Sequence, residues 1–327
     1  MFSFVLAKAP YRISFFGGGT DYPAWYRENP GAVLATSIDK YCYILCRWLP
    51  PFFEEKNRVV WSQIELTQAV DEIRHPAARE ALKTLGMEGI EIHHAGDLPA
   101  RAGMGTSSAF TVALVHALYA LNCRELDKMQ LALESIRIEQ DMTKENVGSQ
   151  DQTISAFGGF NRIDFERDHE IKVTSIHSLR LSKLEASLML FFTGFSRTAS
   201  KIAQAQIDNM QKNNSILLEM YAMVDEGVKI LTSESELAEF GKLLGETWKM
   251  KRRLAGTVST DYVDYIYSNA ISAGAIGGKL LGAGGGGFIL FYVEPDLQPR
   301  VKERLSNLLH VPFKFEKRGS QIIFNGG

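Results

Sequence analysis

Hydrophobic positions in the first third of the chain gather in four short runs of β-branched and aromatic residues, each with turn residues around it. Such runs are typical of strands, because branched and aromatic side chains fit a pleated, half-buried surface. The predicted strands are residues 5–15, 32–49, 58–62 and 89–94. We therefore expect the first third of the chain to be mostly sheet.

Helical patterns follow from residue 110 onward. Residues 110–121 are apolar almost all round, which predicts a buried helix. The next helix is expected to begin at Asp127, because this N-cap residue has Gln130 at the capping-box position. That helix is expected to end near residue 144, and its acidic residues are Glu134, Glu139 and Asp141.

The rest of the chain mixes strand and helix patterns. Strands are predicted at residues 159–165, 171–174, 187–193, 275–281, 288–293 and 321–324. Helices are predicted over residues 198–253, with a break at 232–235 where Ser233 and Glu236 offer a capping box, and over residues 261–273. We place a lobe boundary near residues 181–186, which gives an N-terminal domain of residues 1–183 and a C-terminal domain of residues 184–327.

A glycine-rich loop that ends in hydroxyl residues, 99–109, runs directly into the apolar helix. Its glycines free the backbone to wrap an anion, and the helix N-terminus adds unpaired N–H groups and the positive end of a dipole. This arrangement is typical of a phosphate-binding loop. Its candidate binding residues are Gly103, Met104, Gly105, Thr106, Ser107 and Ser108.

Two further glycine segments support a nucleotide site. One covers residues 9–21, and the other, residues 279–288, contains four consecutive glycines. A plain hairpin with four glycines would carry a large entropic cost, so a close backbone approach to a ligand or to another segment explains them better. Any one of these loops can be only a tight connection, whereas three together favour nucleotide binding.

Two common nucleotide-binding patterns are absent from the phosphate loop. Gly105 is followed by three hydroxyl residues and not by the lysine of a Walker motif, and the third glycine of the dinucleotide fingerprint is missing. The net charge of −2 provides no general attraction for nucleic acid or for an anionic membrane. We therefore expect small-molecule partners, no nucleic acid and no membrane.

The three glycine segments resemble, in the same order, the three motifs of the kinase superfamily named for galactokinase, homoserine kinase, mevalonate kinase and phosphomevalonate kinase (GHMP). Within it, residues 12–23, 147–152 and 156–161 most resemble bacterial D-glycero-D-manno-heptose 7-phosphate 1-kinases, with fucokinase a near neighbour. The resemblance implies an α+β fold of two lobes, with the active site in the cleft between an N-terminal and a C-terminal GHMP kinase domain. It also implies ATP as the phosphoryl donor and Mg²⁺ as a cofactor.

The resemblance assigns catalytic roles to two residues. Asp151 matches the catalytic aspartate, which accepts or orients the proton of the acceptor hydroxyl, and Arg12 matches the basic residue that pairs with it. A loop serine and a glutamate upstream of the catalytic aspartate would hold Mg²⁺ through oxygen atoms. We favour Ser107 over its neighbours Thr106 and Ser108, and Glu139 over Glu134 and Asp141.

The acceptor is expected to contact the first and third motifs and one later arginine. Galactokinases carry a Glu-His pair where this chain has two glycines, so the sugar pocket should be roomier here. Asp21 is then the expected residue that binds a sugar hydroxyl, and the alternative is that it only closes an Asx turn. A sugar phosphate also needs a cation, for which Arg197 is the first candidate and Arg101 the next. The expected substrate-binding residues are Gly18, Gly19, Thr20, Asp21, Arg197, Gly284 and Gly285.

The resemblance thus implies an enzyme that phosphorylates the anomeric hydroxyl of D-glycero-D-manno-heptose 7-phosphate, for nucleotide-activated heptose in capsule or other surface polysaccharide. Two alternatives stay open: another sugar 1-kinase, such as a fucokinase or a galactokinase-like enzyme, and a non-catalytic nucleotide-binding protein. The three cysteines cannot all pair, which favours a reduced, cytoplasmic setting. A homo-oligomer is also left open.

Overall fold

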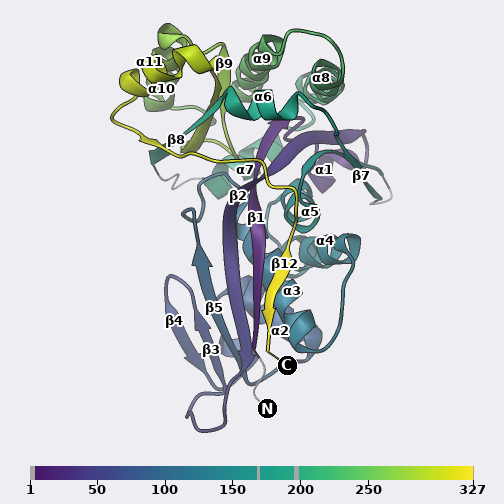
Figure 1. The fold of residues 1–327 in the computed structure, drawn as a ribbon. Coiled ribbons are helices and arrows are strands. Elements are labelled where there is room, and N and C mark those ends of the chain that lie inside the picture. Colours follow the sequence, from purple (N-terminus) through teal and green to yellow (C-terminus); the bar gives the residue numbers. More distant parts are fainter. Residues whose placement is uncertain (1–3, 168–169, 195–198, 327) are drawn as a thin grey trace.

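The computed structural model of the protein describes residues 4–167, 170–194 and 199–326. A long sheet forms the lower part of the molecule in Figure 1, with strand order β12-β1-β2-β5-β3-β4 and with β6 and β7 attached beside β2. All pairings in it are antiparallel except β3 with β5. Its strands are β1 (Phe4–Phe16), β2 (Gly31–Trp48), β3 (Asn57–Val60), β4 (Ile64–Thr67), β5 (Ile90–Gly96), β6 (Phe160–Phe165), β7 (Ile171–Ser175) and β12 (Gln321–Asn325).

Helices cover one face of this sheet. The buried helix α3 (Thr106–Leu121) packs against β1 and β2, and three further helices surround it (Figure 1). These are α2 (Pro76–Leu85), α4 (Lys128–Ile136) and α5 (Gln150–Phe157), while the short α1 (Pro23–Tyr26) follows β1. The predicted capping box at the start of α4 is confirmed, because the backbone N–H of Gln130 donates to Asp127 Oδ1 at 2.8 Å and the Gln130 side chain accepts the backbone N–H of Asp127 at 3.0 Å.

The upper part contains a second, smaller sheet and a group of helices. The sheet has the antiparallel order β11-β8-β10-β9, from β8 (Leu188–Gly194), β9 (Gly277–Leu280), β10 (Gly287–Tyr292) and β11 (Leu309–His310). The helices are α6 (Leu181–Ala186), α7 (Ala199–Asp208), α8 (Asn214–Thr232), α9 (Ala238–Leu254), α10 (Asp261–Ala273) and α11 (Gln298–Arg304). No helix in the described ranges is long and apolar enough to cross a membrane.

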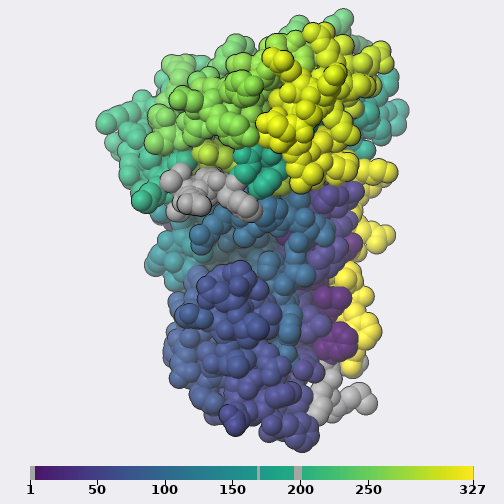
Figure 2. Space-filling view, turned by 90° about the vertical axis from the view of Figure 1, so that its left-hand side faces the viewer, coloured from purple at the N-terminus to yellow at the C-terminus, as the bar shows by residue number. Residues whose placement is uncertain are grey.

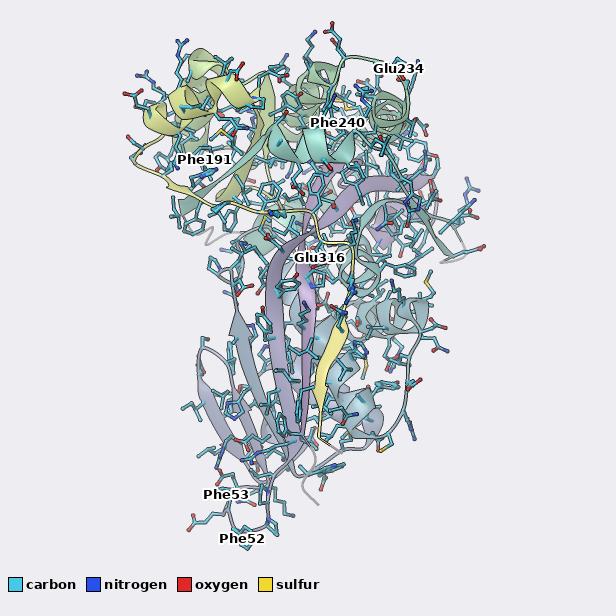
Figure 3. All side chains as sticks on the ribbon, viewed as in Figure 1. Phe52, Phe53, Phe191, Glu234, Phe240 and Glu316 are labelled. Atoms are coloured by element: carbon cyan, nitrogen blue, oxygen red, sulfur yellow. The ribbon has the colours of Figure 1, made fainter. Side chains whose placement is uncertain are left out.

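The largest of three buried hydrophobic clusters spans both parts of the molecule. Phe16 at the end of β1 meets Phe240 of α9 edge to face, with ring centroids 4.9 Å apart, where the long strand reaches the upper helices (Figure 3). The end of the chain also joins the parts, because β12 pairs with β1; Figure 2 shows these yellow residues running down from the upper lobe. The division at residues 183 and 184 stays a prediction, and strand pairing places residues 321–325 in the first sheet.

The predicted strands and the helix at residues 261–273 are confirmed, whereas four helical details differ. The expectation that the first third is mostly sheet missed α2, and the predicted buried helix begins at Thr106, directly after the phosphate loop. The predicted capping box at Ser233 and Glu236 is wrong, because α9 begins at Ala238 and the Ser233 hydroxyl bonds to Ser235 instead. The helix predicted to reach residue 144 ends in a π-helical turn, Arg137–Met142.

Candidate active site

A cavity of about 590 Å³ lies where the two parts of the molecule meet. Its wall is made of β1 with the turn after it, the phosphate loop, the segment that leads into α5, and residues of the C-terminal lobe. The charged residues in this wall are Arg12, Asp21, Arg101, Lys144, Glu145, Asp151, Lys251 and Lys279. Basic residues outnumber acidic ones in this set, which suits anionic ligands.

Arg12 and Asp151, the two predicted catalytic residues, form a bidentate ion pair. Arg12 Nε donates to Asp151 Oδ1 at 2.7 Å, and Arg12 Nη2 donates to Oδ2 at 2.9 Å. Arg12 Nη1 donates to the carbonyl oxygen of Gly103 at 2.7 Å. Arg12 lies in β1 and Asp151 in the first turn of α5, so the fold brings distant segments together and fixes both beside the phosphate loop.

The predicted phosphate loop ends at the N-terminus of α3. Gly103 and Gly105 have φ values of +81° and +70°, in the left-handed region that favours glycine. A Cβ atom on Gly105 would lie 3.2 Å from Asp151 Oδ2, so this glycine also lets the carboxylate approach the loop. Met104 is buried and accepts the backbone N–H of Arg12 at 3.2 Å. The other five predicted loop residues, Gly103, Gly105, Thr106, Ser107 and Ser108, line the cavity.

The third glycine segment, residues 279–288, packs closely against the backbone of the phosphate loop. A Cβ atom on Gly287 would lie 2.4 Å from the carbonyl oxygen of Ala102, so the close approach that the four glycines predicted is to another segment. Gly285 donates its backbone N–H to Val258 at 2.9 Å, and a Cβ atom on Gly284 would meet the same carbonyl at 2.7 Å. The structure does not bring Gly284 or Gly285 to the cavity wall, which Gly282 and Ala283 line instead.

Asp21 lies buried in the wall and joins the first motif to the segment before α5. Its carboxylate accepts the backbone N–H of Gly19 at 3.0 Å and Gln150 Nε2 at 2.9 Å. The contact with Gln150 is long-range, so Asp21 does more than close a local turn. Burial, followed by the nearby charge of Asp151, raises the pKa of Asp21. Of its predicted neighbours, Gly18 and Gly19 line the cavity. Thr20 does not, and its hydroxyl is hydrogen-bonded to backbone groups of Gly17 and Ala32 instead.

Glu139 lies in the π-helical turn that follows α4 and is almost completely buried. Its carboxylate accepts hydrogen bonds from Ser108 Oγ at 2.8 Å, from Thr111 Oγ1 at 2.6 Å and from the side chain of Gln152. Burial raises the pKa of Glu139 to about 7, and no described residue forms an ion pair with it. Glu139 does not line the cavity itself but contacts the loop through Ser108. A buried carboxylate in this place, without a basic partner in the described ranges, fits a site for a hard cation.

The hydrogen bonds and the exposure of the candidate metal ligands differ. The Ser108 hydroxyl bonds Glu139, and the Thr106 hydroxyl accepts the backbone N–H of Arg101 at 3.2 Å. Ser107 lies in the cavity wall, and its hydroxyl forms no hydrogen bond with the described residues. On the same helical region, Glu134 pairs with Arg137 and Asp141 is exposed, so neither takes the place of Glu139. Ser107 and Glu139 therefore stay our preferred ligands.

Sequence reasoning missed two lysines in the cavity wall, Lys251 of α9 and Lys279 of β9, which are both buried. Lys251 falls on the apolar face of α9 with Leu244 and Trp248, at helical spacing, and this periodicity could have identified it. Lys251 was overlooked because the basic residues next to it in the sequence are exposed, and a basic cluster usually indicates a solvated surface. Arg197 lies outside the described residues, whereas Arg101 lines the cavity.

A phosphate loop at a helix N-terminus, beside a carboxylate held by an arginine, defines the active site of a phosphotransferase. Residues 71–159 match the model of the GHMP kinases N terminal domain, and residues 230–311 match that of the GHMP kinases C terminal domain. The chain belongs to the GHMP kinase family, and it is an ATP-dependent sugar kinase. The α+β GHMP kinase fold expected from the motifs is confirmed.

Several relatives match nearly the whole chain. The D-glycero-alpha-D-manno-heptose 7-phosphate kinase of Campylobacter jejuni is 26% identical, over 89% of this chain and 90% of that protein. The L-fucokinase/L-fucose-1-P guanylyltransferase of Bacteroides fragilis is 27% identical over 92% of this chain but 35% of that longer protein. A D-glycero-D-manno-heptose 1-phosphate kinase from Bacteroides thetaiotaomicron shares the fold with a TM-score of 0.77 and 24% identity, covering 97% of this chain and 98% of that one.

Proposed function

We propose that the protein transfers the γ-phosphoryl group of ATP to the anomeric hydroxyl of D-glycero-D-manno-heptose 7-phosphate and forms the 1,7-bisphosphate. In this proposal the enzyme works in the cytoplasm and supplies nucleotide-activated heptose for capsule or other surface polysaccharide. The observation that carries the reaction is the Arg12–Asp151 pair, held 2.7 Å apart beside the phosphate loop. Similarity to the heptose 7-phosphate kinase over 89% of the chain supports the choice of sugar.

Each predicted residue has a place in this reaction. Asp151 accepts or orients the proton of the attacking hydroxyl, and Arg12 holds the carboxylate in position and offsets the charge that develops in the transition state. Backbone N–H groups of the loop and of the α3 N-terminus bind the phosphates of the nucleotide. Ser107 and Glu139 would hold Mg²⁺, which neutralises part of the phosphate charge when bound. Asp21 would bind a sugar hydroxyl.

A panel of sugars and sugar phosphates, assayed for ADP release, tests this function. Turnover with heptose 7-phosphate and little or none with unphosphorylated sugars is the expected result. Turnover with free fucose would favour the second candidate, a fucokinase, which the similarity to the Bacteroides fragilis protein supports. ATP binding without turnover on any sugar would show a non-catalytic nucleotide-binding protein.

Glu139→Gln and Ser107→Ala should each raise the Mg²⁺ concentration needed for half-maximal rate, by roughly 10-fold or more, because the first removes the negative charge of the carboxylate and the second removes a hydroxyl oxygen. Mg²⁺ competes with the proton for the ionised carboxylate. Since the pKa of Glu139 is raised to about 7, the Mg²⁺ requirement of the parent enzyme should rise as the pH falls below 7. Mg²⁺ titrations of the rate at several pH values measure both effects. Glu134→Gln is the matched control. An equal effect of this change would assign Glu134 as the metal ligand in place of Glu139.

Arg197→Ala tests the cation that the sequence suggested for the sugar phosphate. We expect the KM for heptose 7-phosphate to rise roughly 10- to 150-fold, which corresponds to the loss of one charge-assisted hydrogen bond. The KM for ATP should barely change, and any residual activity on the unphosphorylated sugar should not fall. Steady-state kinetics with both sugars check this, and equal losses on both would assign Arg197 to the fold or to the nucleotide.

A further inference from the structure

Lys251 and Lys279 are buried in the wall of the active-site cavity, and each is anchored by two backbone carbonyl groups. Lys251 Nζ donates to Leu280 at 3.0 Å and also to Gly282. Lys279 Nζ donates to Ser14 at 2.9 Å and to Phe15 at 2.7 Å. A protonated lysine has three N–H donors, so these contacts leave one donor of each side chain over.

The charge of these two lysines is poorly balanced by the described part of the chain. Neither forms an ion pair with a described carboxylate, and the charged groups near both are Arg12 and Asp21. Arg12 is already paired with Asp151, and Asp21 is hydrogen-bonded by Gln150. Burial, then the charge of Arg12, lowers the pKa of Lys251 to about 7. Burial, then the charges of Lys251 and Arg12, lowers that of Lys279 well below its usual value.

Two more polar atoms of the same wall lack partners. Ser14 Oγ and Gln150 Oε1 are buried and form no hydrogen bond with any described residue. Buried polar groups are nearly always hydrogen-bonded in native proteins, so unpaired ones beside a cavity point to groups that a ligand satisfies. The hydroxyl, the amide oxygen and the two ammonium groups together suit a ligand with hydroxyl groups and an anionic group.

We propose that Lys251 and Lys279 bind the phosphate group that the acceptor sugar already carries, the group that is not transferred. This assignment rests on the proposed function, in which the acceptor is a sugar phosphate. The acceptor is favoured over ATP because Lys279 is anchored to the backbone of the first motif, in the strand that carries Arg12, and because Asp21 is the acid near both lysines. The nucleotide phosphates have their own site at the N-terminus of α3.

Lys251→Met and Lys279→Met remove the charges while keeping side chains of similar length. Each should raise the KM for heptose 7-phosphate roughly 10- to 150-fold and leave the KM for ATP within about 3-fold. Any residual activity on unphosphorylated heptose should not fall. Lys249→Met is the matched control, because Lys249 lies on the same helix but is exposed and pairs with Glu246, so its kinetics should match the parent. A raised KM for ATP with an unchanged KM for the sugar phosphate would assign the lysines to the nucleotide and overturn the proposal.

Calorimetry on the parent enzyme provides a test that does not depend on how the variants fold. At pH 8, binding of heptose 7-phosphate should be accompanied by proton uptake, because the anion restores the charge of lysines with lowered pKa values. Titrations in two buffers of different ionisation enthalpy measure this uptake, and its absence would overturn the proposal.

The same panel separates this proposal from the proposed function. If the parent enzyme uses another sugar phosphate, the choice of heptose is wrong, and the lysine variants are then tested with that compound. If it uses only uncharged sugars, the phosphate site is wrong while the kinase activity stands.

Discussion

Asp151→Asn is expected to lower kcat about 100-fold or more while leaving the KM for ATP nearly unchanged. Asparagine keeps the size of the side chain and can still contact Arg12, but its amide cannot accept the proton of the attacking hydroxyl. Asp151 lies in the first turn of α5 and shares the cavity wall with the phosphate loop without belonging to it. The loss should therefore fall on the chemical step and not on nucleotide binding.

Steady-state kinetics with ATP and the sugar phosphate measure this effect, with equilibrium ATP binding as a separate readout. Asp141→Asn is a suitable control, since this carboxylate is exposed and does not line the cavity. If the kcat of the Asp151→Asn variant stays within a few-fold of the parent value, Asp151 has no catalytic role.

Arg12→Met is expected to lower kcat roughly 100- to 1,000-fold, the usual cost of losing a preorganised donor near the reacting group. The change removes both contacts to Asp151 and the contact to the carbonyl oxygen of Gly103, so it frees the carboxylate and the loop together. Arg12→Lys should recover only part of the rate, because an ammonium group cannot reproduce the planar, bidentate contact.

The matched control for this change is Arg58→Met. Arg58 pairs with Glu55 and Glu91 in the first sheet, and it does not line the active-site cavity. Its replacement removes a comparable set of ion pairs, so kcat should stay within about 3-fold of the parent if Arg12 acts at the reaction centre. Equal losses in the two variants, with lowered melting temperatures, would instead show that Arg12 serves stability.

Local sequence signals predicted much of the secondary structure, and the signals for what was missed were also local. The α2 helix has Pro76 at its first position, His75 as its N-cap and Gly86 in the left-handed region after its end. These signals mark the helix as clearly as the capping box at Asp127 marks α4. The Ser233 hydroxyl forms a hydrogen bond with the Ser235 hydroxyl and does not cap a helix. Short polar side chains bond to neighbouring groups in a turn as readily as to a helix N-terminus.

Motif resemblance predicted which residues gather at the site, and the structure places Arg12, Asp151, Glu139 and most of the phosphate loop together. The roles of these residues stay predictions. The resemblance gave no reason to single out Lys251, because its neighbours in the sequence are exposed basic residues. Only the packing of α9 against β9 places this lysine against the backbone of the glycine segment.

The sequence by itself determined the properties that depend on a few neighbouring residues. These are the predicted strands, the cap at Asp127, the glycines that allow positive φ in the phosphate loop, and the membership of the kinase family. The tertiary structure decided which groups are buried together. In the folded chain Glu139 is buried beside the phosphate loop, and β12 pairs with β1 of the first sheet. Lys251 and Lys279 are buried in the cavity wall. Burial and charge balance depend on residues that are distant in sequence, so local patterns cannot fix the pKa of Glu139 or of Lys251.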